Sequence, residues 1–203
     1  SIVVNKSSGV NYASKTNGKG KSIFDLTSSY LRRKYPNQQG LHLIHSMDNQ
    51  ESGLCIFARS KHAQLKMSEQ WNEVELNYYA ILQNPLKHKN ETFIFESEEK
   101  NIKVNYNFIE AINYSDTTCN LVSVSGLGFS SIECRKAFAQ KGNPIVADLT
   151  YGAVEFANNY LKLCCNTIKF RHPFTQKSIK ITMNPPKGFN TINPPYKKQN
   201  GHK

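Results

Sequence analysis

The stretch LHLIHSMDNQESGLCIFARS, residues 41–60, places one acid between two apolar runs. Asp48 follows the first run, and Gly53 with several polar residues separates it from the second run over residues 54–57. A short apolar run bounded by turn residues predicts a buried strand, here over residues 54–58. A carboxylate beside such a strand is costly to bury without a partner. An acid in this position is most often a turn or capping residue, so the stretch alone leaves catalysis open.

Strand-like and helical patterns occur on both sides of this stretch. The patterns predict helices over residues 24–34, 61–71 and 132–141, and strands over residues 2–5, 54–58, 75–82, 161–170 and 178–183. Isoleucine-rich and tyrosine-rich segments follow at residues 102–114 and 120–127. Strands dominate and several form hairpin-like pairs. This favours an α+β domain on a mixed, largely antiparallel sheet with flanking helices over a regular parallel α/β fold.

The chain divides by composition into a body and a short tail. We expect one domain over residues 1–189, followed by a basic tail rich in Pro and Asn over residues 190–203. Within the domain, residues 84–101 are expected to form an insertion or an exposed hairpin.

The chain is strongly basic. Its formal net charge of +11 comes from 26 Lys and Arg against 15 Asp and Glu. Such an excess favours a polyanionic partner, with nucleic acid first and an acidic membrane surface second. The sequence has no run of about eighteen apolar residues, so we expect no membrane-spanning helix and no membrane partner.

Cysteine and glycine usage weighs against metal and nucleotide sites. The five cysteines form no CxxC pair and lack zinc-ligand spacing, so no metal site is predicted. Their odd number and apolar surroundings indicate buried, reduced thiols and an intracellular protein. Gly126 and Gly128 alone are too weak a signal for a phosphate loop. A small-molecule enzyme is therefore the least favoured class of function.

Five segments, in one order along the chain, together resemble the RluA-type pseudouridine synthases. That family has an Asn-Lys-Pro-x-Gly turn, a His-Arg-Leu-Asp segment followed by Thr-Ser-Gly-Leu, and a Lys-x-Tyr-x-Ala strand. A helix beginning His-Gln-Ile-Arg, a Gly-x-Pro-Ile segment and a His-Pro hairpin follow. The corresponding segments here are VVNKSSGV (3–10), HSMDNQESGLCIFARS (45–60), VELNYYAIL (74–82), ECRKAFAQKGNPIVADLTYG (133–152) and FRHPFTQKSIKITMNPPKGF (170–189).

The resemblance implies a pseudouridine synthase fold and an isomerase that converts uridine to pseudouridine in a structured RNA, with ribosomal RNA as the expected target. It implies that Asp48 is the nucleophile and that Arg135 pairs with it. It also implies that Tyr78 stacks on a uridine flipped out of the RNA and helps to move a proton. From the residues alone, core packing is an equal alternative for Tyr78. The family reaction needs no metal, nucleotide or redox cofactor. The expected partners are RNA and a ribosomal or pre-ribosomal particle with its proteins.

Cationic and imidazole side chains are candidates for RNA contacts, although each one singly is more often ordinary surface or structure. The candidates are Lys6, Arg32, Arg33, Lys34 and His45.

Several positions depart from the family pattern. Ser46 stands where the family has the Arg of His-Arg-Leu-Asp, and Leu76 stands where it has the Lys of Lys-x-Tyr. Of the run that ends at Arg135, only that arginine is retained. Two accounts follow: an enzyme whose substrate is held by other proteins or a larger particle, or an RNA-binding protein of ribosome assembly or structure. The Lys- and Asn-rich sequence favours an organelle such as the mitochondrion, with the cytoplasm as the alternative.

Overall fold

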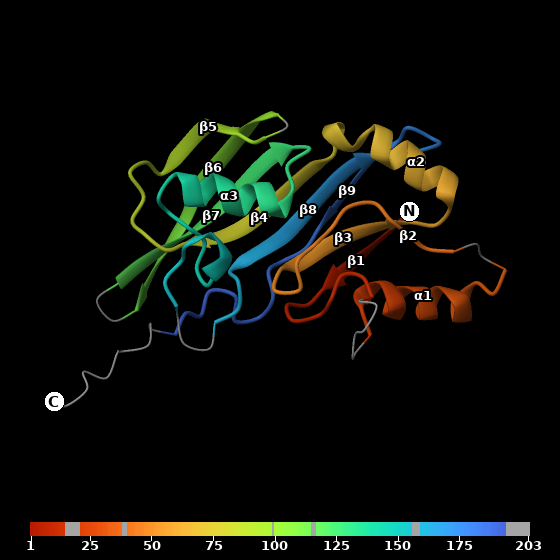
Figure 1. The fold of residues 1–203 in the computed structure, drawn as a ribbon, viewed down its shortest axis with the longest axis horizontal. Coiled ribbons are helices and arrows are strands. Elements are labelled where there is room, and N and C mark those ends of the chain that lie inside the picture. Colours follow the sequence, from red (N-terminus) through yellow and green to blue (C-terminus); the bar gives the residue numbers. More distant parts are fainter. Residues whose placement is uncertain (15–20, 38–39, 99, 115–116, 156–158, 194–203) are drawn as a thin grey trace.

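The computed structural model describes residues 1–14, 21–37, 40–98, 100–114, 117–155 and 159–193. The strands are β1 (Ile2–Lys6), β2 (His42–Leu43), β3 (Ser52–Ala58), β4 (Glu75–Leu82), β5 (Asn90–Glu96), β6 (Asn101–Tyr114), β7 (Thr117–Leu127), β8 (Leu163–Arg171) and β9 (Ser178–Thr182). The helices are α1 (Ile23–Lys34), α2 (Lys61–Glu69) and α3 (Ser131–Gln140), with short 3-10 helices η1 (Trp71–Glu73) and η2 (Leu149–Tyr151). Figure 1 shows their arrangement.

These strands join in one nine-stranded sheet, which confirms the expected α+β class. Its order is β1-β3-β8-β4-β7-β6-β5, with β2 beside β3 and β9 beside β8. Of the pairings between described strands, only β3 with β8 is parallel. The strand β8, near the end of the chain, therefore joins β3 to β4.

The expected closing hairpin is present, and a second hairpin lies at one edge of the sheet. The strands β8 and β9 form the expected closing hairpin, with Phe170 opposite Ile179. The segment 84–101 contains β5, which pairs with β6 at one edge of the sheet. The helix expected over residues 61–71 ends earlier, at Glu69, and the chain continues into η1.

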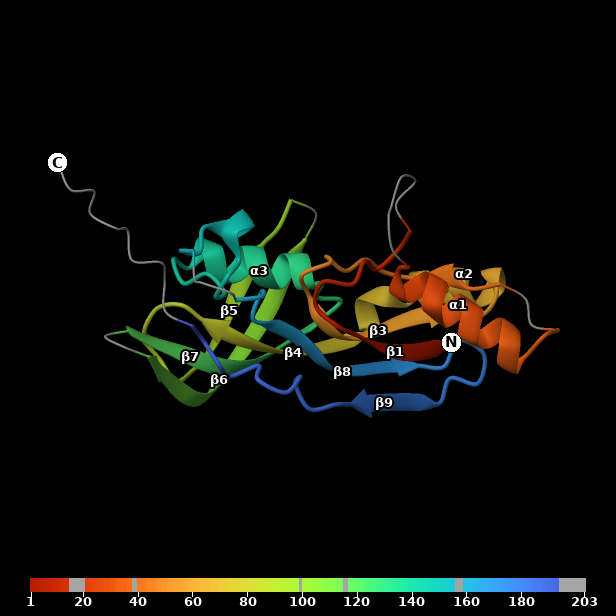
Figure 2. The same ribbon diagram turned by 90° about the horizontal axis from the view of Figure 1, so that it is seen from below.

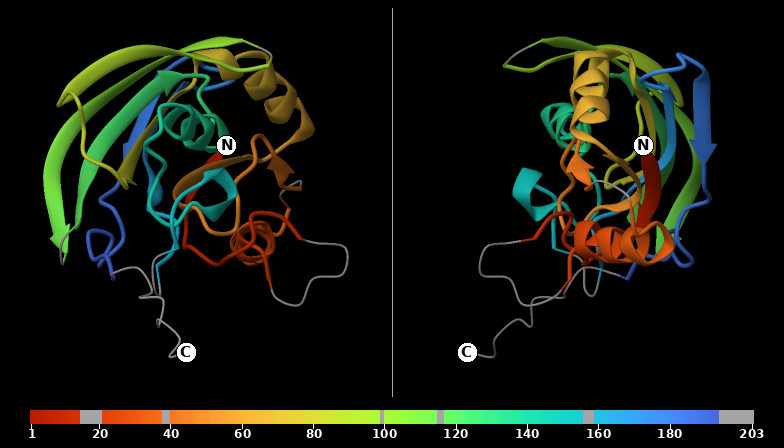
Figure 3. Two further views of the ribbon diagram at one scale, coloured as in Figure 1. Left: turned by 60° about the vertical axis from the view of Figure 1, so that its left-hand side comes forward. Right: turned by 90° about the vertical axis from the view of Figure 1, so that its right-hand side faces the viewer.

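The helices α2 and α3 pack on the face of the sheet that carries Leu54 and Ile56 of β3, and α1 packs on the opposite face. Figure 2 shows the sheet and its helices from below. Figure 3 shows β5, β6 and β7 curving around α3. On α3, Cys134, Ala137 and Phe138 are buried at the spacing of one helix face, and they belong to the large apolar cluster formed with the sheet. A second cluster, which includes Leu31 of α1 and Phe57 of β3, holds α1 against the other end of the sheet.

The ends of α3 follow from local sequence. Ser130 accepts a hydrogen bond from the Glu133 N–H, and the Glu133 carboxylate accepts one from the Ser130 N–H, which forms a capping box. At the other end Gly142 has a φ of +70°, a conformation that glycine adopts without steric cost, and the helix stops there as expected. Local sequence therefore fixes both ends of α3.

Gly53 sets the approach of β3 to β8. Its φ is +106°, and a Cβ atom built on it would lie 2.2 Å from the carbonyl oxygen of Cys165. No side chain fits at that distance, so the parallel contact between the two strands requires glycine.

The core extends past the expected boundary at residue 189. Ile192 is 8% exposed and packs with Ile81 and Phe189 in an apolar cluster on the sheet. The first residues of the expected tail are therefore part of the folded body, and residues 194–203 lie outside the described residues. Within the described part of the chain, no helix is long and apolar enough to cross a membrane.

Candidate active site

Arg135 and Asp48 are in contact, as the family resemblance implied. Arg135 lies on the buried side of α3 with only 3% of its surface exposed. Its Nη1 lies 3.3 Å from Asp48 Oδ2. Its Nε and Nη2 donate to the two carboxylate oxygens of Asp148 at 2.8 and 2.7 Å. The guanidinium also lies over the ring of Tyr151, 4.9 Å from its centroid. Asp148 and Tyr151 therefore hold the arginine that meets Asp48.

The Asp48 carboxylate is accessible and ionised. Its side chain is 47% exposed, and Oδ1 accepts a hydrogen bond from the Gln50 N–H at 3.2 Å. Partial burial opposes ionisation, but the Gln50 N–H and the Arg135 guanidinium outweigh it and hold the pKa of Asp48 below its usual range. An ionised, exposed and oriented carboxylate is what nucleophilic attack requires.

Glu51 is a member of this cluster that sequence reasoning missed. It is 1% exposed, and its Oε2 accepts hydrogen bonds from Ser131 Oγ at 2.7 Å and from the Asp48 N–H at 3.1 Å. Its Oε1 lies 3.3 Å from Arg135 Nη1. A signal was available in the sequence, since Glu51 stands where the family motif has Thr before Ser-Gly-Leu.

Lys6 is not an exposed phosphate contact, so this expectation is corrected. The side chain is fully buried, and Nζ donates to the carbonyl oxygens of Ser7, Val10 and Asn49 at 3.2, 2.8 and 3.0 Å. Burial lowers the pKa of its ammonium, although the carboxylates of the cluster oppose that change. Lys6 instead ties β1 to the loop that carries Asp48.

Tyr78 borders a small cavity beside the loop of Asp48. The ring is 3% exposed, and its hydroxyl donates to the Phe129 carbonyl oxygen at 3.1 Å. Burial raises the pKa of Tyr78 well above its usual value, so the hydroxyl stays protonated. Met47 and Trp71 also line the cavity, which has a volume of about 20 Å³. Such a space holds roughly one water molecule.

His45 has a structural place in the same wall. Its ring lies between Tyr12 and Trp71, with centroids at 5.3 and 5.2 Å. Its Nε2 accepts the Ile56 N–H at 3.2 Å, which assigns the proton to Nδ1 in the neutral ring. Burial lowers the pKa of His45 to about 4. The expectation of an RNA contact is therefore corrected in one respect, because a neutral imidazole offers no charge to phosphate.

The basic end of α1 is exposed. Arg32, Arg33 and Lys34 form the last turn of the helix, and all three side chains face solvent. Lys34 Nζ lies 3.1 Å from the Tyr30 hydroxyl. These three cations are accessible to a phosphate backbone, and their contact with RNA stays a prediction.

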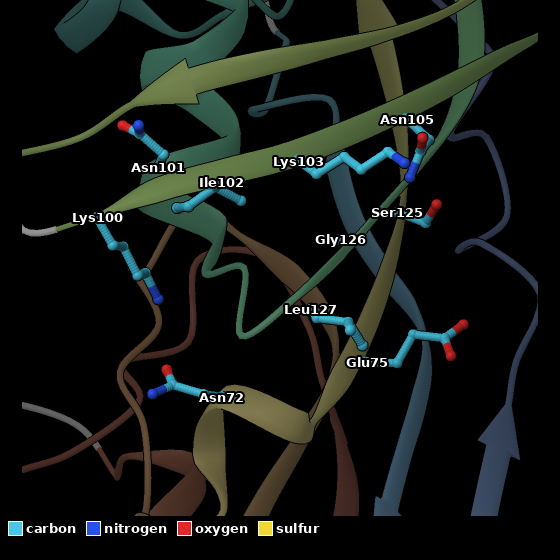
Figure 4. A pocket seen from close by; sticks show the side chains of 10 residues that line it. All are labelled: Asn72, Glu75, Lys100, Asn101, Ile102, Lys103, Asn105, Ser125, Gly126 and Leu127. Carbon is cyan, nitrogen blue, oxygen red and sulfur yellow. The ribbon is translucent and has the colours of Figure 1, made fainter.

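Two larger hollows open on the surface, one of them at Asp48. One, of about 480 Å³, is lined by Asp48, Asn49, Ser46 and Asn11 among others. A second, of about 460 Å³, opens at the ends of β4, β6 and β7 and is shown in Figure 4. There Lys103, Asn105 and Ser125 gather on one side. Both hollows are lined by polar and apolar side chains together.

Among the described residues, no group of three or more His, Cys, Asp or Glu side chains is arranged to hold a metal ion. All five cysteines are buried free thiols.

Known proteins share sequence similarity with this chain. Residues 1–139 match the family model described as RNA pseudouridylate synthase. The chain is 26% identical over 203 residues to ribosomal large subunit pseudouridine synthase C of Buchnera aphidicola subsp. Baizongia pistaciae, covering 89% of this chain and 63% of that protein. It is 28% identical over 207 residues to the protein of that name from Haemophilus ducreyi, covering 89% and 62%. The chain thus spans less than two thirds of these relatives.

Two solved human structures have a similar fold. Human RNA pseudouridylate synthase domain containing 4 superposes with a TM-score of 0.70 at 15% identity, covering 92% of this chain and 86% of that one. Human RNA pseudouridylate synthase domain containing 1 gives 0.69 at 18% identity, covering 97% and 86%. At these identities the likeness shows the fold alone.

Proposed function

The chain belongs to the RNA pseudouridylate synthase family, and we propose that it isomerises uridine to pseudouridine in ribosomal RNA with Asp48 as the nucleophile. The ribosomal target is proposed from the names of the relatives, ribosomal large subunit pseudouridine synthase C. A ribosomal or pre-ribosomal particle is the proposed partner. The net positive charge of the chain suits RNA in general but does not select one uridine, so we propose that the particle provides this selection.

The observation that carries the proposal is the state of Asp48. Its carboxylate is 47% exposed and paired with an arginine that is itself held from behind by Asp148. A carboxylate that served only as a turn residue would not need a buried guanidinium fixed in this way. The pair keeps the acid ionised and oriented toward solvent, where a nucleotide can reach it.

In the proposed reaction Asp48 attacks a uridine that has left the RNA stack. The Asp48 carboxylate bonds to the ribose carbon as the bond from that carbon to the ring nitrogen breaks, and the base turns. A carbon of the same base then displaces the Asp48 carboxylate from the ribose carbon. The proton lost from this base carbon is balanced by one gained at the ring nitrogen. Product and substrate have the same atoms, so the overall change is an isomerisation.

Tyr78 contributes through its ring. Its hydroxyl is held by the Phe129 carbonyl and stays protonated, so a stacking role suits it better than proton transfer. The cavity beside Tyr78, about 20 Å³ in volume, is too small for a base. Entry of the uridine therefore requires Met47 or Trp71, which line the cavity, to move.

The test is a pseudouridine map of RNA that co-purifies with the protein, from cells carrying the normal chain and cells carrying Asp48→Asn. We expect one or a few uridines of ribosomal RNA to lose modification in the variant while RNA still co-purifies. Glu69→Gln, an exposed substitution in α2, is the matched control and should leave the map unchanged. An identical map in Asp48→Asn cells contradicts the proposal.

A second candidate function is RNA binding without turnover, in ribosome assembly or structure. The small cavity beside Tyr78 favours it, together with Ser46 and Leu76 at positions where the family carries cations. This function predicts that Asp48→Asn has no effect, while Arg32→Glu and Arg33→Glu together release RNA. Site-specific pseudouridine formation by the purified protein on transcribed ribosomal RNA excludes it.

A further inference from the structure

Glu51 is buried at the centre of the proposed active site without reaching solvent. It is 1% exposed, so it cannot contact RNA directly. One of its carboxylate oxygens accepts from both Ser131 Oγ and the main-chain N–H of Asp48. The other faces Arg135. The partners of Glu51 therefore lie either on α3 or on the turn that carries Asp48.

The donors of Arg135 are divided unequally among three carboxylates. Asp148 takes Nε and Nη2 at 2.8 and 2.7 Å. Nη1 then serves both Asp48 and Glu51, each at 3.3 Å. Two carboxylates that lie 3.3 Å from one nitrogen have their nearest oxygens at most 6.6 Å apart, twice that distance. At such a separation each charge acts on the other even through water.

The burial of Glu51 and its hydrogen-bond donors act on its ionisation in opposite directions. Burial raises the pKa of Glu51, although the Ser131 hydroxyl and Arg135 oppose that change. The titratable and charged groups that face Glu51 come from every neighbouring element: Lys6 on β1, Asp48 on the turn, Tyr78 on β4, Cys134 and Arg135 on α3, and Cys165 on β8. Asp148 faces it across Arg135.

The two carboxyls therefore ionise in a fixed order as the pH rises. Asp48, whose pKa is lowered, loses its proton first, and Glu51, whose pKa is raised, loses its proton later. When Glu51 ionises, it does so beside an Asp48 that already carries a charge. Arg135 Nη1 then lies beside two charged carboxylates, those of Asp48 and Glu51, in place of one.

We propose that Glu51 is a positioning residue for Asp48: it holds the Asp48 turn through the Asp48 N–H and, when ionised, competes for Arg135 Nη1, which weakens the hold of Nη1 on the Asp48 carboxylate and frees that carboxylate for attack. This inference rests on the proposed function of Asp48. Protonated Glu51 leaves the Asp48–Arg135 pair closed, and ionised Glu51 opens it.

The first test does not depend on activity. The carboxyl carbons of Asp48 and Glu51 are followed by NMR during a pH titration of the free protein. We expect the Asp48 signal to show a second inflection at the Glu51 midpoint, and Glu51→Gln to remove it. In Asp48→Asn the Glu51 midpoint should fall by at least about half a pH unit, because a neighbouring charge is gone.

The second test measures turnover of transcribed ribosomal RNA by the full chain. Since Glu51 does not reach solvent, Glu51→Gln should leave KM unchanged and lower kcat by about tenfold or more, as expected for loss of a hydrogen bond between charged groups. The pH profile of kcat should lose the limb that follows Glu51. Glu69→Gln, which removes one exposed negative charge, should change neither.

These outcomes distinguish a failure of the inference about Glu51 from a failure of the proposed enzymatic function. Independent titration of Asp48 and Glu51 overturns the inference, whatever the protein does to RNA. Coupled titration in a protein that forms no pseudouridine supports the sharing of Arg135 and overturns the enzymatic function instead. If Glu51→Gln does not fold, Asp48→Asn still gives the decisive midpoint, because the Asp48 side chain is half-exposed and its loss leaves no cavity.

Discussion

Arg135 and Asp148 form a two-point ion pair in which Nε and Nη2 of the guanidinium each donate to a separate carboxylate oxygen. Both side chains are almost completely buried, at 4% and 1% exposed. The arginine is therefore held in place whether or not Asp48 is engaged. If Asp48 leaves Arg135 in order to react, Arg135 stays in its place through Asp148.

Asp148→Asn should weaken the fold. Removal of one partner leaves the Arg135 charge buried and poorly matched, which typically costs about 3–5 kcal/mol of the free energy of unfolding. Urea denaturation measures this change. Glu91→Gln breaks the ion pair of Glu91 with Lys141, both of which are partly exposed, and should cost less than about 1 kcal/mol. Equal losses in the two variants would contradict the central place of Asp148.

Glu51→Gln should alter how stability depends on pH. A carboxyl whose pKa is raised by folding stabilises the folded state below its ordinary pKa of 4.5, and this contribution is lost as the pH rises through the raised value. Glutamine at position 51 does not ionise, so the variant does not lose stability in this way as the pH rises. Relative to the normal chain, its free energy of unfolding should therefore increase as the pH is raised above 4.5. A constant difference from acid to neutral pH would show that Glu51 ionises in its ordinary range.

Asp48→Asn should show the opposite trend. The pKa of Asp48 is lowered from 3.8 in the folded chain, so its stabilising contribution is present above that value and is lost as the pH falls further. The variant should be less stable than the normal chain at neutral pH, and the difference should shrink in acid. Denaturation at pH 7 and near pH 3 measures both ends of this range.

Gly53→Ala should destabilise the junction of β3 and β8. A methyl group there would lie 2.2 Å from the Cys165 carbonyl oxygen, at a φ of +106° that alanine disfavours. Overpacking and backbone strain each cost about 1–3 kcal/mol, so the sum should reach several kcal/mol. Gly40→Ala is the control, since the nearest atom to its added methyl lies 4.0 Å away. A Gly53→Ala protein that melts like Gly40→Ala would contradict this account of the junction.

The basic residues should separate into two kinds. Replacement of Arg32, Arg33 and Lys34 by Ala should leave the fold unchanged and weaken RNA binding. The slope of the logarithm of the RNA association constant against the logarithm of the salt concentration should fall by up to about one for each phosphate that the protein no longer neutralises.

Lys6→Met should affect the stability of the fold and not the binding of RNA. It removes one hydrogen-bond donor from each of three carbonyl oxygens, so it should reduce stability without altering the salt slope of the folded protein.

The sequence allowed prediction of what depends on local pattern. The apolar run 54–58 is a fully buried strand, and the helix that stops before Gly142 lies where its periodicity indicated. The contact of Asp48 with Arg135 joins residues 87 positions apart, and only the resemblance to a family made it predictable. Periodicity carries no information on such a pairing.

The burial of two charged side chains, Lys6 and Glu51, could not be predicted from the sequence. Lys6 and Glu51 belong to residue types that are almost never fully buried, so ordinary expectation places them on the surface. Both are buried here because long-range partners satisfy them: the Asn49 carbonyl for Lys6, and Ser131 and Arg135 for Glu51. Those partners come from segments that meet only after folding.

The place of β8 between β3 and β4 has a consequence for the order in which a growing chain can fold. As the chain leaves the ribosome, β1, β3 and β4 emerge long before the strand that connects them. Until residues 163–171 appear, the two parts of the sheet have no shared backbone ladder, and Gly53 has no partner in Cys165. Such late, long-range closure is slow and leaves strand edges open meanwhile. The loop of Asp48 therefore reaches its final position only after residues 163–171 have been synthesised.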